Sequence, residues 1–404
     1  QERFVQYEER LIELGEKEVE RCGNEQPEFL EMAQFYLGQA KQNLSDYQDL
    51  YRTNILDGFK ALETSGHLEL VTTAATHAYL PLYTEYPTAI NAQIELGVQS
   101  FLTTFGHLPK GFWLPECGYY PALEENLKYH GISWFQTASQ SMLLSPDKVQ
   151  YGNYRPVRCP NGVAAFPRDF QGTSLVWSNT SGYPTDKAYR EFYRDIGYDL
   201  PMEYIKPYIH EPSVRVFTGY KYWAITGHTD QKVPYQRSEA QKRVVEHAHN
   251  FIYNLKKKGR QLSSAMGVAP LFTLAYDAEL FGHWWFEGIE WLDQVIRLAA
   301  KESEEISLVT PSLFLSKEGA GLQTARPAFS SWGQGGYSAV WLDGSNAWTY
   351  RHIHKAIERM EELAVRFNDP VPYTQLTLPT EREVEMSRSA RAAKKKKEKH
   401  ILDK

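Results

Sequence analysis

Two short apolar runs that each end in a carboxylate constrain the fold of this chain most strongly. Residues 111–115 lead to Glu116, and residues 270–276 lead to Asp277. Short apolar and aromatic runs followed by a sharp change to polar residues are typical of buried strands. Helical patterns separate such runs, and this alternation predicts an α/β fold of parallel βα units. Because loops at the carboxyl ends of barrel strands build active sites, two acids placed there among Trp and Tyr residues suggest carbohydrate chemistry.

The remaining pattern predicts where other elements lie. We expect helices within 1–64 and at 87–106, 119–130, 238–258, 285–301 and 345–367, the last capped by Ser345 or Asn346. We expect further strands at 66–72, 131–136 and 306–310. From about residue 140 to 235, Pro, Gly and Tyr interrupt the pattern, which predicts an inserted subdomain or a set of long, functional loops.

Composition narrows the function classes. The formal net charge is −6, so the chain has no general nucleic-acid-binding signature. No apolar run approaches the roughly 18–20 residues that a membrane span needs. The 10 Trp and 26 Tyr residues could stack on sugar rings or simply fill a large core. Cys22, Cys117 and Cys159 have neither a disulfide nor a zinc spacing, which favours a reducing cytoplasm.

The composition changes abruptly at about Val371, and a basic run from Arg388 to Lys399 follows. Such a run could bind nucleic acid or direct nuclear import. We favour a simpler interpretation, because residues 371–404 resemble translated sequencing-adapter DNA. We therefore expect an unrelated tail, disordered or artefactual, and assign it no function.

Four local patterns go beyond composition. They are ELVTTAATH at 69–77, WLPECGY at 113–119, YDAELFGHWW at 276–285, and SWGQGG with VWL within 331–342. Together they strongly resemble glycoside hydrolase family 57, and within it the branching enzymes, over about residues 1–368. The resemblance implies an incomplete, distorted (β/α)7 barrel at 1–310, with an inserted loop-rich helical region at 140–260. It also implies the start of a C-terminal helical domain at 311–370.

The same resemblance implies a retaining double displacement with Glu116 as nucleophile and Asp277 as general acid/base. Such enzymes hold two carboxyl groups about 5–5.5 Å apart. Glu116 would form a covalent glycosyl-enzyme, and Asp277 would protonate the departing oxygen and then deprotonate the acceptor. In branching, that acceptor is the 6-hydroxyl group of another α-1,4-glucan chain. The alternative is that both acids are only helix N-caps or surface acids at strand ends.

Eight further residues are expected to bind the substrate: His77, Trp113, Tyr151, Gly182, His283, Trp284, Trp332 and Trp341. The family uses tryptophans in the positions of Trp332 and Trp341 to stack on glucan rings. It also carries a loop tyrosine, here Tyr151, that covers the site against water. The alternatives are a satisfied core histidine at 77, an exposed loop tyrosine at 151 and a plain turn glycine at 182.

Structural roles are expected for some neighbours of these residues. We expect Trp285 to pack in the core and Glu279 to form a salt bridge. Arg168 and Asp169 follow a short apolar stretch, and we expect a structural ion pair there rather than a contact with substrate.

The chain departs from the family pattern at both ends, and of the family's C-terminal helical domain we expect only about the first helix. The family's first motif, an early strand with histidines, lies upstream of everything here, so we expect the first barrel strand to be missing. A barrel without a strand has open edges and an unfilled core, which puts stability and activity in question.

The leading hypothesis is a cytoplasmic, monomeric branching enzyme acting on α-1,4-glucan of the glycogen or starch type, without metal, cofactor, nucleic-acid or membrane partner. A family α-amylase or 4-α-glucanotransferase would share both carboxylates and differ in its acceptor. An inactive glucan-binding fragment is a third hypothesis. A zinc-dependent, deacetylase-like barrel using His77 is disfavoured, because the sequence offers no compact set of three ligands.

Overall fold

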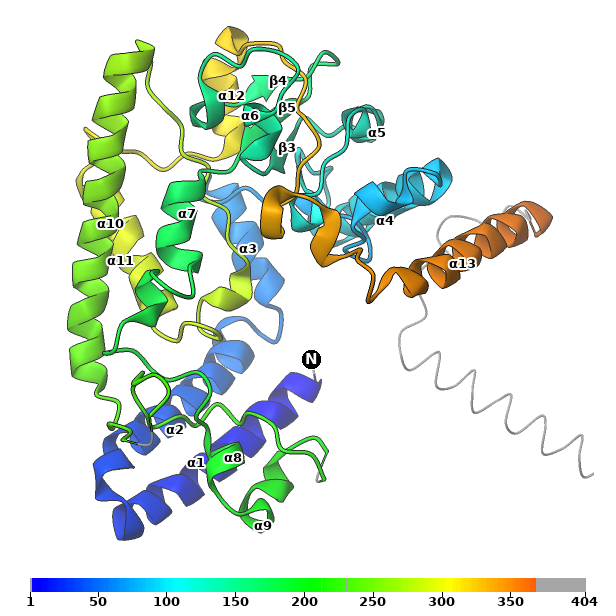
Figure 1. Ribbon diagram of the computed structural model, residues 1–404. Coiled ribbons are helices and arrows are strands. Elements are labelled where there is room, and N and C mark those ends of the chain that lie inside the picture. Colours follow the sequence, from blue (N-terminus) through cyan, green and yellow to red (C-terminus); the bar gives the residue numbers. More distant parts are fainter. Residues whose placement is uncertain (1, 212, 230, 368–404) are drawn as a thin grey trace, which may run out of the picture. The chain divides into compact units, whose positions relative to one another are not determined.

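The computed structural model describes residues 2–211, 213–229 and 231–367. The chain divides into two compact units, Gln1–Asp343 and Gly344–Lys404, which are described separately. The first contains the sheet and most of the helices (Figure 1). In the second, helix α13 (Ala347–Arg366) begins after Asn346, one of the two predicted caps. The predicted tail at 371–404 lies outside the described residues.

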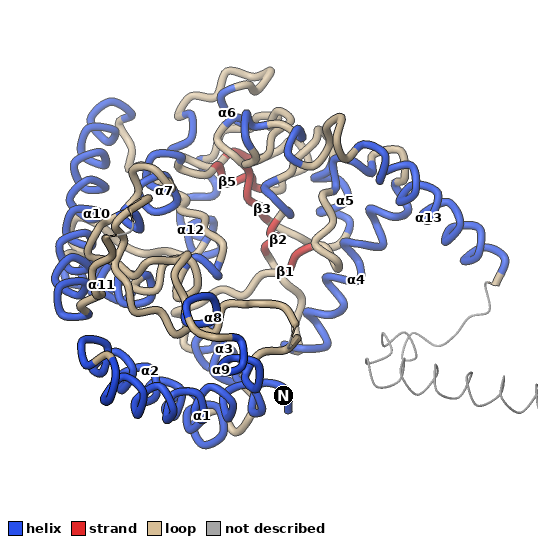
Figure 2. The backbone as a smooth tube through the Cα atoms, turned by 60° about the horizontal axis from the view of Figure 1, so that its bottom comes forward, coloured by secondary structure: helices blue, strands red, loops and turns tan. Residues whose placement is uncertain are grey.

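A five-stranded sheet lies in the middle of the first unit (Figure 2). In spatial order its strands are β1 (Thr72–Thr73), β2 (Gly111–Trp113), β3 (Trp134–Thr137), β5 (Ala164–Pro167) and β4 (Val157–Arg158). The strands from β1 to β5 pair in parallel, and β4 pairs antiparallel with β5. Helices separate the parallel strands along the chain, so the predicted α/β fold is confirmed, and the open sheet agrees with an incomplete barrel. Parallel strands end at one edge, where the residues that follow them come together.

Three predicted strands are shorter than expected or absent. Of the strand predicted at 66–72, only the last residue, Thr72, pairs with a neighbouring strand, as part of β1. Residues 270–277 contribute one parallel bridge, between Thr273 and Arg168, which extends the sheet edge beyond β5. The strand predicted at 306–310 is wrong, because Leu308 and Val309 are exposed and the segment pairs with no described strand. Its last residue, Thr310, instead caps the following helix.

The first unit contains the predicted helices, with shifted ends, and short helices in segments for which none was predicted. They are α1 (Glu2–Glu25), α2 (Leu30–Ser45), α3 (Ile55–Thr64), α4 (Pro87–Phe105), α5 (Leu123–Tyr129), α6 (Gln140–Leu143), α7 (Phe170–Trp177), α8 (Ile196–Asp199), α9 (Met202–Ile205), α10 (Arg237–Met266), α11 (Gly288–Lys301) and α12 (Pro311–Glu318). Helix α10 continues past its predicted end at residue 258 and stops at Gly267, whose φ of 71° suits glycine best.

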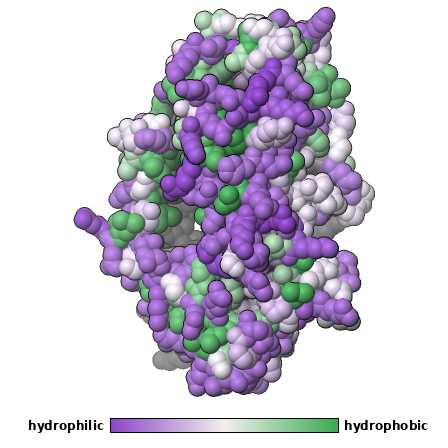
Figure 3. Space-filling model, turned by 90° about the vertical axis from the view of Figure 1, so that its left-hand side faces the viewer, coloured by the Kyte–Doolittle hydropathy of each residue, from purple (hydrophilic) through white to green (hydrophobic). Residues whose placement is uncertain are grey.

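Helices α10 and α11 lie along each other beside the sheet (Figure 1). Phe251 of α10 and Trp291 of α11 are both buried, and their ring centroids are 5.0 Å apart. Burial of such a side chain contributes about 1.5–3 kcal/mol, so this contact fixes α11 and the loop that precedes it. The outer side of α10 is polar, and the face of the molecule on which it lies is mostly hydrophilic (Figure 3).

A buried carboxylate joins the N-terminal helices to the inserted region. Glu18 of α1 is fully buried and pairs with Arg21 at 2.8 Å. Its two oxygens also accept hydrogen bonds from the hydroxyl groups of Tyr204 (2.7 Å) and Tyr222 (2.8 Å). Part of the stretch that interrupts the sequence pattern therefore packs on α1, a contact that no local pattern revealed.

A second buried carboxylate, Asp195, holds the loops of this inserted region. It accepts hydrogen bonds from the backbone amides of Gly197, Thr218 and Gly219. It also pairs with the buried Lys221 at 3.4 Å. We expect Asp195→Ala to lower the free energy of unfolding by about 3–5 kcal/mol, because Lys221 would stay buried without its partner. Urea denaturation measures this loss.

The control for this prediction is Asp199→Ala, which removes a more exposed acid that pairs with Arg194. We expect it to lower the free energy of unfolding by no more than about 1 kcal/mol. Equal losses in the two variants would contradict the assigned role of Asp195.

The three cysteines, Cys22, Cys117 and Cys159, are buried and free. In the described part of the chain, no helix combines the length and the apolar character needed to cross a membrane.

Candidate active site

Glu116 lies in a tight turn immediately after β2. Pro115 starts this turn, and both Glu116 and Cys117 have left-handed backbone, with φ of 59° and 50°. His77, which follows β1, has a φ of 54°. Such a conformation costs roughly 1–3 kcal/mol in a non-glycine residue, and it clusters where a site needs fixed geometry. Strained backbone at two neighbouring strand ends therefore points to this edge of the sheet.

The imidazole of His77 lies beside the carboxylate of Glu116. Its Nε2 is 3.5 Å from Glu116 Oε1. The His77 side chain is half exposed, whereas 30% of the Glu116 side chain is exposed. His77 therefore sits at an open position next to the acid rather than within a closed core.

Trp332 binds Glu116 through two hydrogen bonds. Its indole Nε1 donates to Glu116 Oε2 at 2.7 Å, and its backbone amide donates to the Glu116 carbonyl oxygen at 3.0 Å. Trp113, at the end of β2, meets the Trp332 ring edge-on with centroids 5.5 Å apart. Because an indole N–H only donates, this bond fixes the orientation of the Glu116 carboxyl group.

Trp332→Phe tests this arrangement, because it keeps an aromatic ring and removes the N–H donor. A hydrogen bond to a charged group contributes about 1.5–3 kcal/mol, so we expect kcat on amylose to fall about ten- to a hundredfold. Steady-state kinetics measure the change. Trp348→Phe, at an exposed position in α13, serves as control. Equal activity in Trp332→Phe and the unsubstituted protein would contradict the role of the indole.

Asp277 ends the extended segment that bridges to Arg168 through Thr273. The pKa of Asp277 is raised, first by burial and then by the negative charges of Glu279 and Glu116, while Arg168 and His77 oppose the shift. Glu116 and His77 therefore lie close enough to Asp277 for their charges to act on it. A carboxyl group that keeps its proton to higher pH suits a general acid.

Arg168 is a site residue to which the sequence analysis gave only a structural ion pair. Its guanidinium lies over the Trp332 ring, 4.8 Å from the centroid, and its Nε is buried without a hydrogen-bond partner in the described part of the chain. Burial lowers its pKa. Asp169 does form an ion pair, but with Lys258 at 2.7 Å. The sequence offered one signal for this role, because Arg168 directly follows the buried strand β5.

The ring of Trp341 packs against Tyr79 and Gly333. Its ring stacks on Tyr79 with centroids 4.2 Å apart. A Cβ at Gly333 would lie 2.7 Å from the Trp341 ring, so this position requires the close approach that glycine allows. The ring therefore has one face covered by Tyr79.

The loop after Asp277 carries four more of the residues discussed above. Trp284 is 51% exposed and stacks on Phe192 with centroids 4.6 Å apart, and the exposed His283 lies against both. Trp285 is buried, so its predicted core position is confirmed. Glu279 is exposed and forms no ion pair with a described residue, unlike the salt bridge expected for it.

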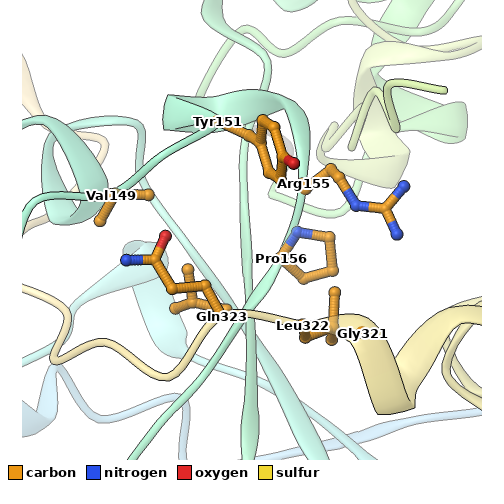
Figure 4. Close-up of a pocket in the computed structure, with 8 residues that line it drawn as sticks. Val149, Tyr151, Arg155, Pro156, Gly321, Leu322 and Gln323 are labelled. Atoms are coloured by element: carbon orange, nitrogen blue, oxygen red, sulfur yellow. The ribbon is translucent and has the colours of Figure 1, made fainter. Parts of the chain in front are cut away.

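Tyr151 lines a very small pocket, and Gly182 lies in a tight turn. Tyr151 lines a pocket of about 10 Å³ together with Arg155, Pro156 and Gln323 (Figure 4). That volume accommodates about one water molecule and no sugar. A Cβ at Gly182 would lie 2.5 Å from the Ser178 carbonyl oxygen, so the tight turn after α7 by itself explains this glycine.

Metal chemistry finds no support in the described residues. They contain no group of three or more His, Cys, Asp or Glu side chains that could hold a metal ion. The described residues therefore do not support the zinc-dependent alternative.

Two acids set among tryptophans at one edge of a mainly parallel sheet are an arrangement that glycoside-cleaving α/β enzymes use. The model of glycosyl hydrolase family 57 matches residues 1–258, and the chain belongs to this family.

Two curated relatives that resemble the chain are named as branching enzymes. The 1,4-α-glucan branching enzyme of Thermococcus kodakarensis is 31% identical over 395 residues, which cover 90% of this chain and 54% of the relative. A probable 1,4-α-glucan branching enzyme of Mycobacterium tuberculosis is 31% identical over 70% of this chain and 48% of its own length. The chain thus spans about half the length of these curated relatives.

Two solved structures share the fold. The α-amylase AmyC from Thermotoga maritima superposes with a TM-score of 0.82 at 42% identity, over 91% of this chain and 69% of that one. A family 57 branching enzyme from Pyrococcus horikoshii superposes with a TM-score of 0.79 at 31% identity, over 92% of this chain and 67% of that one.

Proposed function

We propose that this chain acts as a 1,4-α-glucan branching enzyme, which cleaves an α-1,4-glucan and transfers the segment to a 6-hydroxyl group. The observation that supports a glycosyl transfer is the unequal environment of the two acids, and the curated branching-enzyme relatives favour branching. Trp332 donates to Glu116, whereas burial and neighbouring carboxylates raise the pKa of Asp277. A retaining glycosyl transfer uses two carboxyl groups in different roles, one as nucleophile and one as acid and base.

The reaction takes place in two displacements. A carboxylate oxygen of Glu116 attacks the anomeric carbon, the glycosidic C–O bond breaks, and Asp277 gives its proton to the departing oxygen. Asp277, now ionised, then takes the proton from the 6-hydroxyl group of a second chain. The oxygen of that hydroxyl attacks the anomeric carbon, and the ester bond to Glu116 breaks. Trp332 holds Glu116 in position. His77 lies beside the carboxyl group of Glu116, and the positive charge of Arg168 acts on Asp277.

Hydrolysis is the second candidate function, in which water replaces the 6-hydroxyl group. The 42% identity to the Thermotoga maritima α-amylase favours it. Both reactions use the same acids, so the acceptor alone distinguishes them. The names of the curated relatives favour branching.

Product analysis after incubation with amylose separates these functions. We expect new α-1,6 linkages, seen by proton NMR and as short chains released by a debranching enzyme, with little rise in reducing ends. Shortened linear chains with rising reducing ends would establish hydrolysis instead. Glucan binding without any new product would contradict both candidates and favour a non-catalytic fragment.

The cellular setting that we propose is the reducing cytoplasm, with a branched storage glucan of the glycogen type as product. Three buried, free thiols support the reducing compartment. We further propose a monomer, which light scattering after size-exclusion chromatography tests directly.

A further inference from the structure

A second cavity, of about 500 Å³, lies between the N-terminal helices and the inserted region. Its volume falls within the roughly 300–1,000 Å³ typical of small-molecule sites. Its lining combines aromatic with polar and charged side chains and includes Glu8, Tyr36, Gln39, Arg190, Phe217 and His283. Neither Glu116 nor Asp277 lines it, so it is distinct from the carboxylate site.

A buried acid in this cavity lacks part of its hydrogen bonding. Glu8 is 4% exposed, and its Oε2 has no hydrogen-bond partner among the described residues. A buried acceptor without a partner costs about 1–3 kcal/mol, and a ligand hydroxyl group that donates to it would recover this energy. Glu8 thus favours a ligand rich in hydroxyl donors.

The cavity lining carries two cations, Arg190 and Lys221, and two acids, Glu8 and Glu290. Lys221 pairs with Asp195 at 3.4 Å, and Glu290 pairs with Arg237 at 3.0 Å. Burial raises the pKa of Glu8 and so favours its neutral form, and the positive charge of Arg190 acts on the buried Glu287. This near-neutral lining suits a neutral polyhydroxylated ligand better than a phosphate or another anion.

Aromatic rings provide the apolar part of the cavity. Phe217 is 40% exposed, with the ammonium group of Lys221 3.8 Å from its centroid. Phe192 also lines the cavity and stacks on Trp284, on the loop that follows Asp277. Gly282 and His283 of that loop line the cavity too. The cavity is therefore continuous with the loop of the catalytic acid.

We propose that this cavity binds glucosyl units of an α-glucan chain that acts as acceptor, a proposal that rests on the function proposed above. Aromatic rings would stack on the C–H faces of the pyranose rings, while Glu8 and Arg190 bind hydroxyl groups. Sharing the loop of Asp277 gives the acceptor a route toward the residue that deprotonates it.

Hydrogen–deuterium exchange with maltoheptaose tests the site in the Glu116→Gln background, where the ligand is not consumed. We expect maltoheptaose to protect residues 36–43 and 217–221. Gln39→Trp places a large ring at the cavity lining from an exposed position of α2 and should abolish this protection. Gln34→Trp, exposed on the same helix but outside the cavity, should retain it. Unchanged protection in Gln39→Trp, or no protection in either variant, would overturn the proposal.

A second variant pair guards against misfolding of a tryptophan variant. Glu8→Gln keeps the side-chain size and should weaken maltoheptaose binding about tenfold by calorimetry, whereas the exposed Glu9→Gln should not. Equal affinity in these variants would count against the site. If amylose is branched while the cavity variants bind normally, this inference fails and the proposed function stands. If the cavity binds maltoheptaose but amylose stays unchanged, the proposed function fails and the binding site stands.

Discussion

Glu116→Gln is expected to lower kcat on amylose by roughly 10⁴-fold or more, because the amide cannot form the glycosyl ester. The substitution keeps the side-chain size and leaves an oxygen that can accept from the Trp332 indole. KM should therefore change little, because substrate contacts remain. Initial rates of amylose conversion measure the effect.

The control for this variant is Glu124→Gln, also a glutamate in the loop-helix region after β2, but one whose side chain accepts from Tyr119 at 2.6 Å. Glu124 is buried away from solvent, so this variant can lose stability, but its kcat should stay near that of the unsubstituted protein. Substantial turnover by Glu116→Gln would show that another group is the nucleophile.

Asp277→Asn is expected to lower kcat roughly 10³- to 10⁴-fold on amylose, because neither proton transfer remains. The pH dependence follows from its raised pKa. As general acid, Asp277 must carry its proton in the first displacement, so activity should fall as the pH rises through that pKa. In Asp277→Asn the residual rate should lose this alkaline limb. Rates measured across the pH range test both statements.

Glu279→Gln is the matched control on the same loop. Its negative charge helps to raise the pKa of Asp277, so its removal should lower that pKa. The alkaline limb should therefore move to lower pH, while the maximal rate changes little. A shift to higher pH, or none, would contradict the electrostatic account of Asp277.

The sequence pattern was sufficient to predict the α/β fold and the position of Glu116 after a strand, whereas Asp277 follows an extended segment with one bridge at Thr273. Buried strands place their following residues at one edge of a parallel sheet, and this rule requires only local information. The strand predicted at 306–310 failed because a short apolar run does not reveal whether a neighbouring strand exists to pair with it. Leu308 and Val309 are in fact exposed.

Contacts between distant segments could not be predicted in the same way. The hydrogen bond from Trp332 to Glu116 and the position of Arg168 over the Trp332 ring depend on how the ends of β2 and β5 meet the loop that carries Trp332. The cavity beside Glu8 likewise depends on α1 packing against loops near residue 217. Such contacts depend on tertiary packing, and the spacing of residues along the chain does not predict them.

Trapping of the glycosyl-enzyme tests the central claim most directly. Maltosyl fluoride has a leaving group that needs no acid, so Asp277→Asn should be glycosylated and then react slowly for lack of its base. We predict that mass spectrometry of the digested protein locates a maltosyl group on Glu116. A maltosyl group on another residue, or fluoride release without any covalent adduct and with inverted products, would contradict the account.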